Sequence, residues 1–377
     1  MTAKIIHVDE SKSWEEQDLG GDRKELAKKT VCIVRYGGFG DMLQTAALLP
    51  IFKKQGYRVT VNTQDRGYDI LKEDPNIDEF LLQSKDFVGG SALGPYWWKL
   101  HLMFHKFVNF SESVEGGLLA IPGRAPAQFW SKKARHLMMN KNYLEFMADI
   151  ADIPYNGEKP VFYPTKEEDE WAKKTRNKMG KKAKVILWSL SGSSVHKVNP
   201  WVDTVIARVL LMKPEVHFIL TGDEACKHLA GKTWKDEKHV HNWTGFDIRK
   251  TLSFLPYADL VIGPETGVLN AAGGLDDVKK IIFMSHSTPE NVSKHWKNVI
   301  NLEPQKAPCY PCHILHNFGK ELCPMVDLRD HVEVMIKPEW KEEIYKDILD
   351  KPINIALCAL EISSDMIYDA IITSLYR

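Results

Sequence analysis

The sequence predicts an α/β protein with two doubly wound domains. Its 377 residues exceed the roughly 100–200 residues of one typical domain. Short apolar runs alternate with helical patterns in both halves, and a charged stretch at 166–184 separates the halves. Hydrophobic residues make up 44% and charged residues 27%, values that exclude a disordered chain and a coiled coil.

In the first half, residues 1–30 are polar, and we expect an extension or a surface strand and helix there. Strands are expected at the apolar runs 31–35, 57–63 and 80–82. A glycine turn at 36–40 leads into a helix at 42–54, and residues 71–74 continue the alternation. This pattern is typical of a parallel sheet covered by helices, so we assign residues 31–165 to the first domain.

The same alternation restarts after the helix and linker at 166–184. Strands are expected at 185–188, 216–220, 259–262 and 280–283. Helices are expected at 201–212, 248–257 and 266–273. We assign residues 185–337 to the second domain and residues 338–377 to C-terminal helices.

Charge and hydropathy exclude several classes of function. Lys and Arg together number 50, as do Asp and Glu, so no global field attracts nucleic acid or an anionic membrane. The longest apolar runs, 46–52 and 353–360, are shorter than the about 20 residues that span a bilayer. The N-terminus is charged where a secretory signal is apolar, and six cysteines are too few for a disulfide framework. We therefore expect a cytoplasmic protein without a membrane span.

The glycine turn after the first strand contains Gly38, Gly40 and Asp41. Glycine lets the backbone approach a ligand, and the following helix N-terminus offers N–H groups to an anion. The turn lacks the spacing of a dinucleotide fingerprint, and no acidic residue closes the second strand. A purely structural interpretation is also open, in which Asp41 stabilises the first helical turn by about 0.3–1 kcal/mol.

A second turn, Glu265-Thr266-Gly267, lies between a predicted strand and a helix of small residues. Its N–H groups would lie at the carboxyl end of a parallel sheet, where diphosphates bind in α/β folds. The alternative is an ordinary helix cap, in which Thr266 satisfies its own helix.

Several other short motifs accompany these two turns along the chain. They are Ser189, Ser191 and Gly192; Lys197 before Trp201; Ser287, Thr288 and Pro289; and Cys309, Cys312 and Cys323. In this order the chain, from about residue 31 to 338, resembles glycosyltransferase family 9, the bacterial lipopolysaccharide heptosyltransferases. The resemblance implies a GT-B fold, in which two Rossmann-like domains face a cleft. It also implies inverting, metal-independent transfer of a sugar from a nucleotide-diphosphate sugar to a hydroxyl acceptor.

The resemblance assigns roles to individual residues. Asp41 would be the general base, Lys197 would contact the donor phosphate, and Thr266 with Gly267 would cradle the diphosphate. The other residues assigned to donor binding are Gly38, Gly40, Ser189, Ser191, Gly222, Glu265 and Asn270. The family usually has Asp before Thr-Gly and His three residues after it, whereas this chain has Glu265 and Asn270. The sugar and nucleotide of the donor therefore stay open.

Four soft metal ligands lie within 15 residues: Cys309, Cys312, His316 and Cys323. Their spacing is near that of a zinc knuckle without matching it, and His313 offers a competing ligand. A structural zinc and reduced structural thiols both fit this pattern. Neither interpretation makes the cluster catalytic. The metal-independent transfer that the resemblance implies requires no cofactor.

A basic and aromatic stretch between residues 96 and 141 is a candidate surface for an anionic acceptor. The acceptor could be a phosphorylated glycan, a lipid headgroup or nucleic acid. The basic residues assigned to this surface are Lys99, Arg124, Lys132, Lys133 and Arg135. The alternative is that the aromatic side chains belong to the core and the basic ones are ordinary solvated residues.

The function predicted from these patterns is glycosyl transfer. One alternative is a nucleotide-sugar epimerase or hydrolase of the same fold. A second is a nucleic-acid-binding or nucleic-acid-glycosylating protein with a degenerate transferase fold, which the cysteine cluster and the local basic excess suggest. A general base facing a diphosphate pocket favours the enzyme, because a protein that only binds has no need of one.

Overall fold

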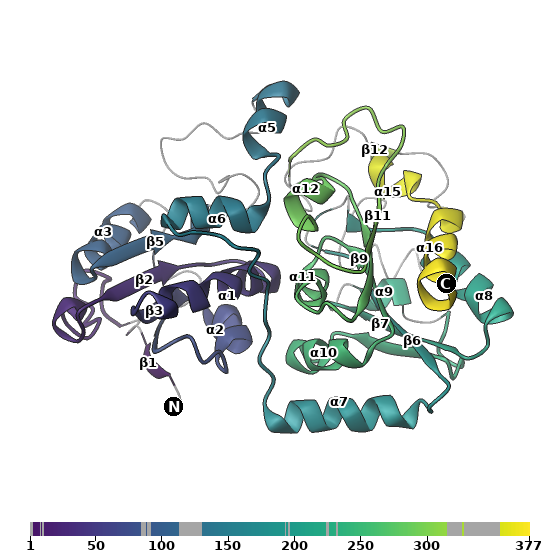
Figure 1. The fold of residues 1–377 in the computed structure, drawn as a ribbon, viewed down its shortest axis with the longest axis horizontal. Helices are drawn as coiled ribbons and strands as arrows, with labels where there is room; N and C mark the ends of the chain where they lie inside the picture. The colour runs from purple at the N-terminus through teal and green to yellow at the C-terminus, as the bar shows by residue number, and fades with distance from the viewer. Residues whose placement is uncertain are drawn as a thin grey trace. The chain divides into compact units, whose positions relative to one another are not determined.

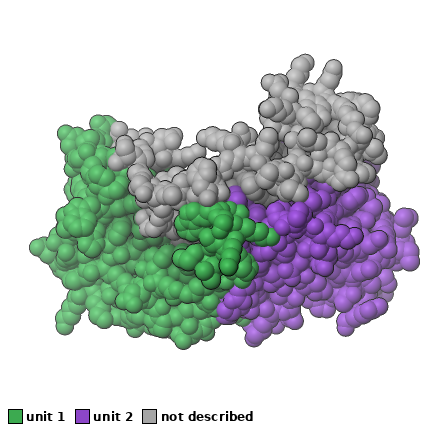
Figure 2. Space-filling view, turned by 90° about the horizontal axis from the view of Figure 1, so that it is seen from above, with its two compact units in different colours: residues 1–165 green, residues 166–377 purple. Residues whose placement is uncertain are grey.

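The computed structural model describes residues 3–7, 9, 11–83, 88, 92–112, 130–192, 194, 197–223, 226–230, 233–314, 326–327 and 355–377. The chain divides into two compact units, residues 1–165 and 166–377 (Figure 2). Each unit contains one parallel sheet, so each is described by itself. Arg124, His316 and Cys323, which the sequence singled out, lie outside the described residues.

The sheet of the first unit has five strands: β1 (Lys4–His7), β2 (Thr30–Val34), β3 (Arg58–Thr63), β4 (Glu79–Leu82) and β5 (Lys106–Asn109). All neighbouring strands are parallel, in the order β1-β4-β3-β2-β5. The chain moves from β2 outward to β3 and β4, then returns to pair β5 with the other side of β2. The carboxyl ends of β2 and β5 therefore form a topological switch point, where open α/β sheets bind ligands.

The helices of this unit are α1 (Phe39–Lys54), α2 (Asp65–Leu71), α3 (Leu93–Met103), α5 (Lys132–Met139) and α6 (Tyr143–Ala151). Helix α3 buries Tyr96 and Leu100 against Cys32, Val34 and Leu81 on one face of the sheet. Because side chains alternate along a strand, the buried neighbours of Cys32 and Val34 in β2 point to the opposite face. The apolar run at 31–35 is therefore a central strand covered on both sides.

Residues 1–30 contribute to the packing of the first unit. Strand β1 pairs in parallel with β4 at the edge of the sheet. Arg23 is buried and donates from Nε and Nη2 to Glu79 Oε1 at 3.0 and 2.8 Å. The ammonium group of Lys99 on α3 donates to the carbonyls of Trp14, Glu15 and Gln17. These contacts fix the segment to the sheet and to α3.

The sheet of the second unit has six strands: β6 (Lys184–Ser189), β7 (Val216–Gly222), β8 (Val240–Thr244), β9 (Leu260–Pro264), β10 (Lys279–Phe283) and β11 (Val299–Leu302). All neighbouring strands are parallel, in the order β8-β7-β6-β9-β10-β11. If β6 is counted as the first strand, the order matches that of the doubly wound sheets that bind dinucleotides. Its switch point lies between the carboxyl ends of β6 and β9.

Helices cover both faces of the second sheet. Helices α8 (Val202–Met212) and α16 (Ser364–Tyr376) share a core with Trp188 and Phe218 on one face. Helices α10 (Ile248–Phe254) and α11 (Gly267–Gly273) lie on the other side of the sheet (Figure 1). The remaining elements are α7 (Lys166–Lys178), α9 (Lys227–Ala230), α12 (Pro289–Val292), α15 (Leu357–Glu361), and the short strands β12 (Val326–Asp327) and β13 (Ile355–Ala356).

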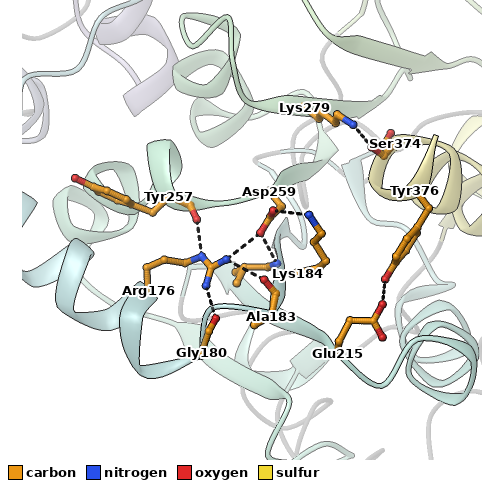
Figure 3. A network of polar contacts seen from close by, with 11 residues as sticks. Arg176, Gly180, Ala183, Lys184, Glu215, Tyr257, Asp259, Lys279, Ser374 and Tyr376 are labelled. Atoms are coloured by element: carbon orange, nitrogen blue, oxygen red, sulfur yellow. Dashed lines mark hydrogen bonds and ion pairs between the residues drawn. The ribbon is translucent and has the colours of Figure 1, made fainter.

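Helix α7, expected as a helix within a linker, is attached to the second unit. The Arg176 guanidinium donates to the carbonyls of Tyr257, Gly180 and Ala183, and to the Asp259 carboxylate at 3.3 Å (Figure 3). The Asp259 carboxylate also accepts the Val185 N–H of β6 at 2.9 Å and lies 3.3 Å from Lys184 Nζ. One network therefore joins α7 to the amino ends of β6 and β9.

The two parallel sheets confirm the predicted α/β class. The strands expected from apolar runs in both halves are present, and β5 adds a strand within the basic and aromatic stretch. The terminal segment expected to be helical carries α15 and α16, whereas residues 338–354 lie outside the described residues. Across the ranges described above, no helix has both the length and the hydropathy of a bilayer-spanning segment.

One buried carboxylate in the first unit gives a testable dependence of stability on pH. Asp74 lies in the turn between α2 and β4, where its Oδ1 accepts two hydrogen bonds from Asn76 at 2.8 Å. Burial raises the pKa of Asp74 from 3.8 to about 6. Because the folded state holds this proton more tightly than the unfolded state, the contribution to stability is present below about pH 4 and is lost as the pH rises through about 6.

We expect Asp74→Asn to raise the free energy of unfolding at pH 7.5 by about 2 kcal/mol, and by less at pH 4.5. Asparagine keeps an acceptor oxygen for Asn76 but cannot ionise, so it removes the cost of a buried charge. Urea denaturation of both proteins at the two pH values measures the effect. An equal gain at both pH values would show that the charge of Asp74 is not its cause.

Candidate functional site

The first candidate site is the glycine turn at the carboxyl end of β2. Gly38 is the N-cap of α1, and helix α1 begins at Phe39, three residues before the predicted start. Gly37 has a positive φ of 118°, and a Cβ there would lie 2.4 Å from Asp41 Oδ2. Glycine is therefore needed at this position, because the Asp41 side chain folds back over the turn. Gly40 lies in the first turn of the same helix.

Both carboxylate oxygens of Asp41 have partners. Oδ1 lies 2.5 Å from Arg35 Nη2, and Oδ2 accepts the Gly38 N–H at 2.7 Å. Arg35 is buried and donates from Nη1 to the carbonyl of Phe110 at 2.6 Å. Since Phe110 follows β5, Arg35 joins the two loops of the switch point and fixes Asp41 beside them. The Asp41 side chain is still 23% exposed, so a ligand hydroxyl can reach it.

The described basic residues assigned to an acceptor surface lie on two different helices, and Arg124 lies outside the described residues. Lys99 on α3 holds the N-terminal segment through three carbonyls, as described above. Arg135 on α5 is buried and donates to the carbonyl of Trp130. Lys132 and Lys133 are exposed in the first turn of α5. Of the four assigned residues that the structure describes, Lys132 and Lys133 are the exposed ones.

The aromatic residues of this stretch divide between core and surface. Phe104 and Phe110 are buried in the first unit, in agreement with the structural alternative. Trp98 is 62% exposed and stacks on His101 with ring centroids 5.1 Å apart.

The second candidate site lies at the switch point of the second sheet. Ser189 ends β6 and Thr266 caps α11, and their hydroxyl oxygens are 3.1 Å apart. Gly263 in β9 has a φ of 149°, and a Cβ there would lie 2.5 Å from the Ser189 carbonyl. The lack of a side chain at Gly263 therefore lets the ends of β6 and β9 approach. Asn270 lies one turn into α11, with its N–H on the Thr266 carbonyl at 2.9 Å.

Lys197 reaches the same place from the loop after β6. A Cβ on Gly192 would lie 2.6 Å from Lys197 Cδ and 3.3 Å from Thr266 Cγ2. The lysine stem therefore passes over Gly192 beside Thr266. Lys197 is 8% exposed, so its charge is held in an environment of low polarity, where it interacts strongly with an anion.

Glu265, directly before this turn, is a buried acid. Its Oε1 accepts the Ser285 N–H at 3.2 Å, and its Oε2 lies 3.4 Å from His286 Nδ1. Burial raises the pKa of Glu265, whereas the charge of Lys197 acts in the opposite direction. Sequence reasoning missed His286 and Ser285. The available signal was their position after the strand at 280–283, which places them at the carboxyl edge of the sheet beside Glu265.

Gly222 and Ser191 both lie close to Cys226, next to the end of β7. The Gly222 carbonyl accepts the Gly245 N–H at 2.9 Å, and a Cβ on Gly222 would lie 2.4 Å from Cys226 Sγ. The Ser191 hydroxyl oxygen is 3.0 Å from the same sulfur. These residues therefore shape the loops that follow β6 and β7.

The cysteine cluster is described only in part. Cys309 and Cys312 are half-buried and neither is in a disulfide, and Cys312 donates to the Ile314 carbonyl at 3.8 Å. His313 is buried, and its N–H donates to the His286 carbonyl at 2.8 Å. Among the described residues, no three His, Cys, Asp or Glu side chains are arranged to hold a metal ion. His316 and Cys323, the other two proposed ligands, lie outside those residues.

No family model and no curated protein matches this chain. Solved structures do match. The glycosyl transferase family 9 protein from Veillonella parvula DSM 2008 has a TM-score of 0.60 and 13% identity, over 92% of this chain and 97% of that one. The E. coli ADP-heptose lipopolysaccharide heptosyltransferase II has a TM-score of 0.59 and 11% identity, over 92% and 98% of the two chains.

A third similar structure is the iron-containing dodecameric glycosyltransferase TibC from enterotoxigenic E. coli. Its TM-score is 0.55 with 12% identity, over 92% of this chain and 78% of that one. At such low identities the similarity establishes the fold. This chain has the α/β fold of these glycosyltransferases, with both parallel sheets included.

Proposed function

We propose that this protein is an inverting glycosyltransferase that moves a sugar from a nucleotide-diphosphate sugar to a hydroxyl acceptor. The observation that carries the proposal is the convergence of Lys197, Gly192 and Thr266 at the switch point of the second sheet. A lysine crossing a glycine beside a helix cap is a suitable site for a diphosphate. The fold shared with glycosyltransferases supports the same function.

Asp41 is the proposed general base. The acceptor oxygen attacks the anomeric carbon, its proton passes to the Asp41 carboxylate, and the bond from that carbon to the phosphate oxygen breaks. The electron pair of that bond leaves with the nucleoside diphosphate. A single displacement of this kind inverts the anomeric configuration. Arg35 and the Gly38 N–H hold the carboxylate in one orientation, which favours proton transfer in a fixed geometry.

Lys197 and the N–H groups at Thr266 and Gly267 are the proposed partners of the leaving diphosphate. A preorganised donor in an enclosed site stabilises a transition state by about 2.7–4 kcal/mol, whereas an exposed ion pair contributes about 0–1 kcal/mol. Lys197 is largely buried, and this supports its assignment as a donor of the enclosed kind. These groups neutralise the developing charge, so the proposed reaction needs no divalent metal.

The substrates follow from the same proposal. ADP-heptose is the first donor to test, because it is named for the E. coli structure with the same fold. An anionic acceptor, such as a phosphorylated glycan, a lipid headgroup or nucleic acid, fits the exposed Lys132 and Lys133 on α5.

We expect turnover to survive a chelator, because Lys197 and backbone N–H groups carry out the neutralisation. The assay follows nucleoside diphosphate release with and without EDTA, and melting temperature on the same samples. Magnesium, manganese and iron are then added back to the EDTA-treated samples. Iron is included because TibC is described as iron-containing. Loss of turnover that a metal restores would contradict the proposed chemistry. A lower melting temperature with unchanged turnover would indicate a structural metal, with the Cys309 cluster as its first candidate.

A further inference from the structure

The second site holds two opposite charges that do not pair with each other. Lys197 and Glu265 both lie beside Thr266, and the charge of Lys197 acts on Glu265. No ion pair joins these two side chains, although both are described and both are largely buried. A buried carboxylate close to an ammonium group is strongly attracted to it. Some other contact must therefore hold the Glu265 carboxyl group in its place.

Two neighbouring residues after β10 supply that contact. The Ser285 N–H donates to Glu265 Oε1 at 3.2 Å, and His286 Nδ1 lies 3.4 Å from Oε2. His286 is 2% exposed, and its carbonyl accepts the His313 N–H at 2.8 Å, so its backbone is also fixed. His286 Nδ1 also lies 3.4 Å from Ser285 Oγ, and a neutral imidazole with its proton on Nδ1 can donate to one of these two oxygens at a time. Both oxygens of Glu265 therefore face chain groups other than Lys197.

We infer that His286 is a positioning residue: it holds the Glu265 carboxyl group away from Lys197 and so keeps the lysine charge for the diphosphate. This inference rests on the proposed function. Without the imidazole, Glu265 can turn to Lys197 and neutralise the charge that attracts the ligand. A carboxylate at that position also repels a diphosphate directly.

The other polar side chains around Glu265 have different contacts from those of His286. The Glu265 carboxylate contributes to raising the pKa of Tyr310, but the Tyr310 hydroxyl donates to Glu303 at 2.7 Å and not to Glu265. The Ser285 hydroxyl is 3.5 Å from Glu265 Oε1, the oxygen that the Ser285 N–H already contacts. The Ser287 hydroxyl also stabilises the charged form of Glu265, and His286 Nδ1 lies 3.4 Å from Oε2.

Calorimetric titration with ADP tests this inference on the full chain. His286→Leu and His286→Met remove the ring N–H donor and are expected to weaken ADP binding by about 10- to 100-fold. His286→Gln keeps an N–H donor and is expected to bind nearly as well as the wild type. In a Glu265→Gln background, His286→Leu is expected to cost far less, because the neutral amide does not compete for Lys197. A purely structural role for His286 predicts the same loss in both backgrounds.

The outcomes separate the inference from the proposed function. Absence of ADP binding, and of UDP or GDP binding, to the wild type would overturn both. Binding to the wild type with an unchanged affinity in His286→Leu, or with an equal loss in the Glu265→Gln background, would overturn the inference alone. If the leucine and methionine variants do not fold, His286→Gln decides, since a loss above tenfold in that folded variant would contradict the positioning role.

Discussion

Asp41→Asn is expected to lower turnover by about 10²–10⁴-fold. Asparagine keeps the shape of the side chain but cannot take the proton of the acceptor hydroxyl, and general base catalysis contributes an effect of this size. Affinity for the nucleotide-diphosphate donor is expected to change little, because the proposed phosphate contacts come from Lys197 and the Thr266 turn. Steady-state kinetics and donor titration on one preparation measure both quantities.

The same substitution also affects stability, because the Asp41 carboxylate pairs with buried Arg35 and accepts the Gly38 N–H. As a first-turn helix acid alone it would contribute about 0.3–1 kcal/mol, and loss of the partner of a buried guanidinium adds to that cost. We therefore expect a lower melting temperature together with the loss of turnover.

A matched control separates the two roles of Asp41. Asp65 is an exposed acid in the first turn of α2, in the same unit. Asp65→Asn removes a negative charge from a helix N-terminus and leaves the proposed base Asp41 in place. It is expected to lower stability slightly and to leave turnover unchanged. A folded Asp41→Asn variant with near wild-type turnover would remove Asp41 from the mechanism. Glu265 would then be the next carboxylate to test.

Lys197→Ala is the second large effect, with an expected loss of at least tenfold in affinity for a nucleoside diphosphate. The substitution removes a charge-assisted contact from a largely buried position, where such contacts are strong. The control is Lys184→Ala in the same unit, because Lys184 begins β6 and pairs with Asp259 at the opposite edge of the sheet. Unchanged calorimetric affinity in Lys197→Ala would show that this lysine does not contact the phosphates.

Local sequence patterns predicted the elements that carry both sites. The apolar runs of the central strands are buried on both faces, so they stand out in the sequence. The turn after β2 was identified by its glycines, and Gly37 within it has a positive φ. The turn after β9 was identified by Thr266 and Gly267, and these residues cap and begin α11. These features depend on residues within a few positions of one another.

Other features depend on contacts between distant residues, which a local pattern does not contain. Strand β1 is mostly exposed, and only its pairing with β4 identifies it as part of the sheet. The Arg23–Glu79 contact spans 56 positions. His286 is next to Glu265 because β9 and β10 are adjacent and parallel, and that register becomes visible only in the fold.

The central claim, a nucleotide-diphosphate sugar site at Lys197 and Thr266, is tested most directly by a thermal-shift screen. Nucleotide-diphosphate sugars, with ADP-heptose included, are compared on the wild type and on Lys197→Ala. A ligand present at 100 times its Kd stabilises the folded state by about 2.7 kcal/mol, which is a readily measured shift. We predict that at least one such sugar raises the melting temperature of the wild type and does so far less in Lys197→Ala. Absence of a shift with every donor, or an equal shift in the two proteins, would contradict the claim.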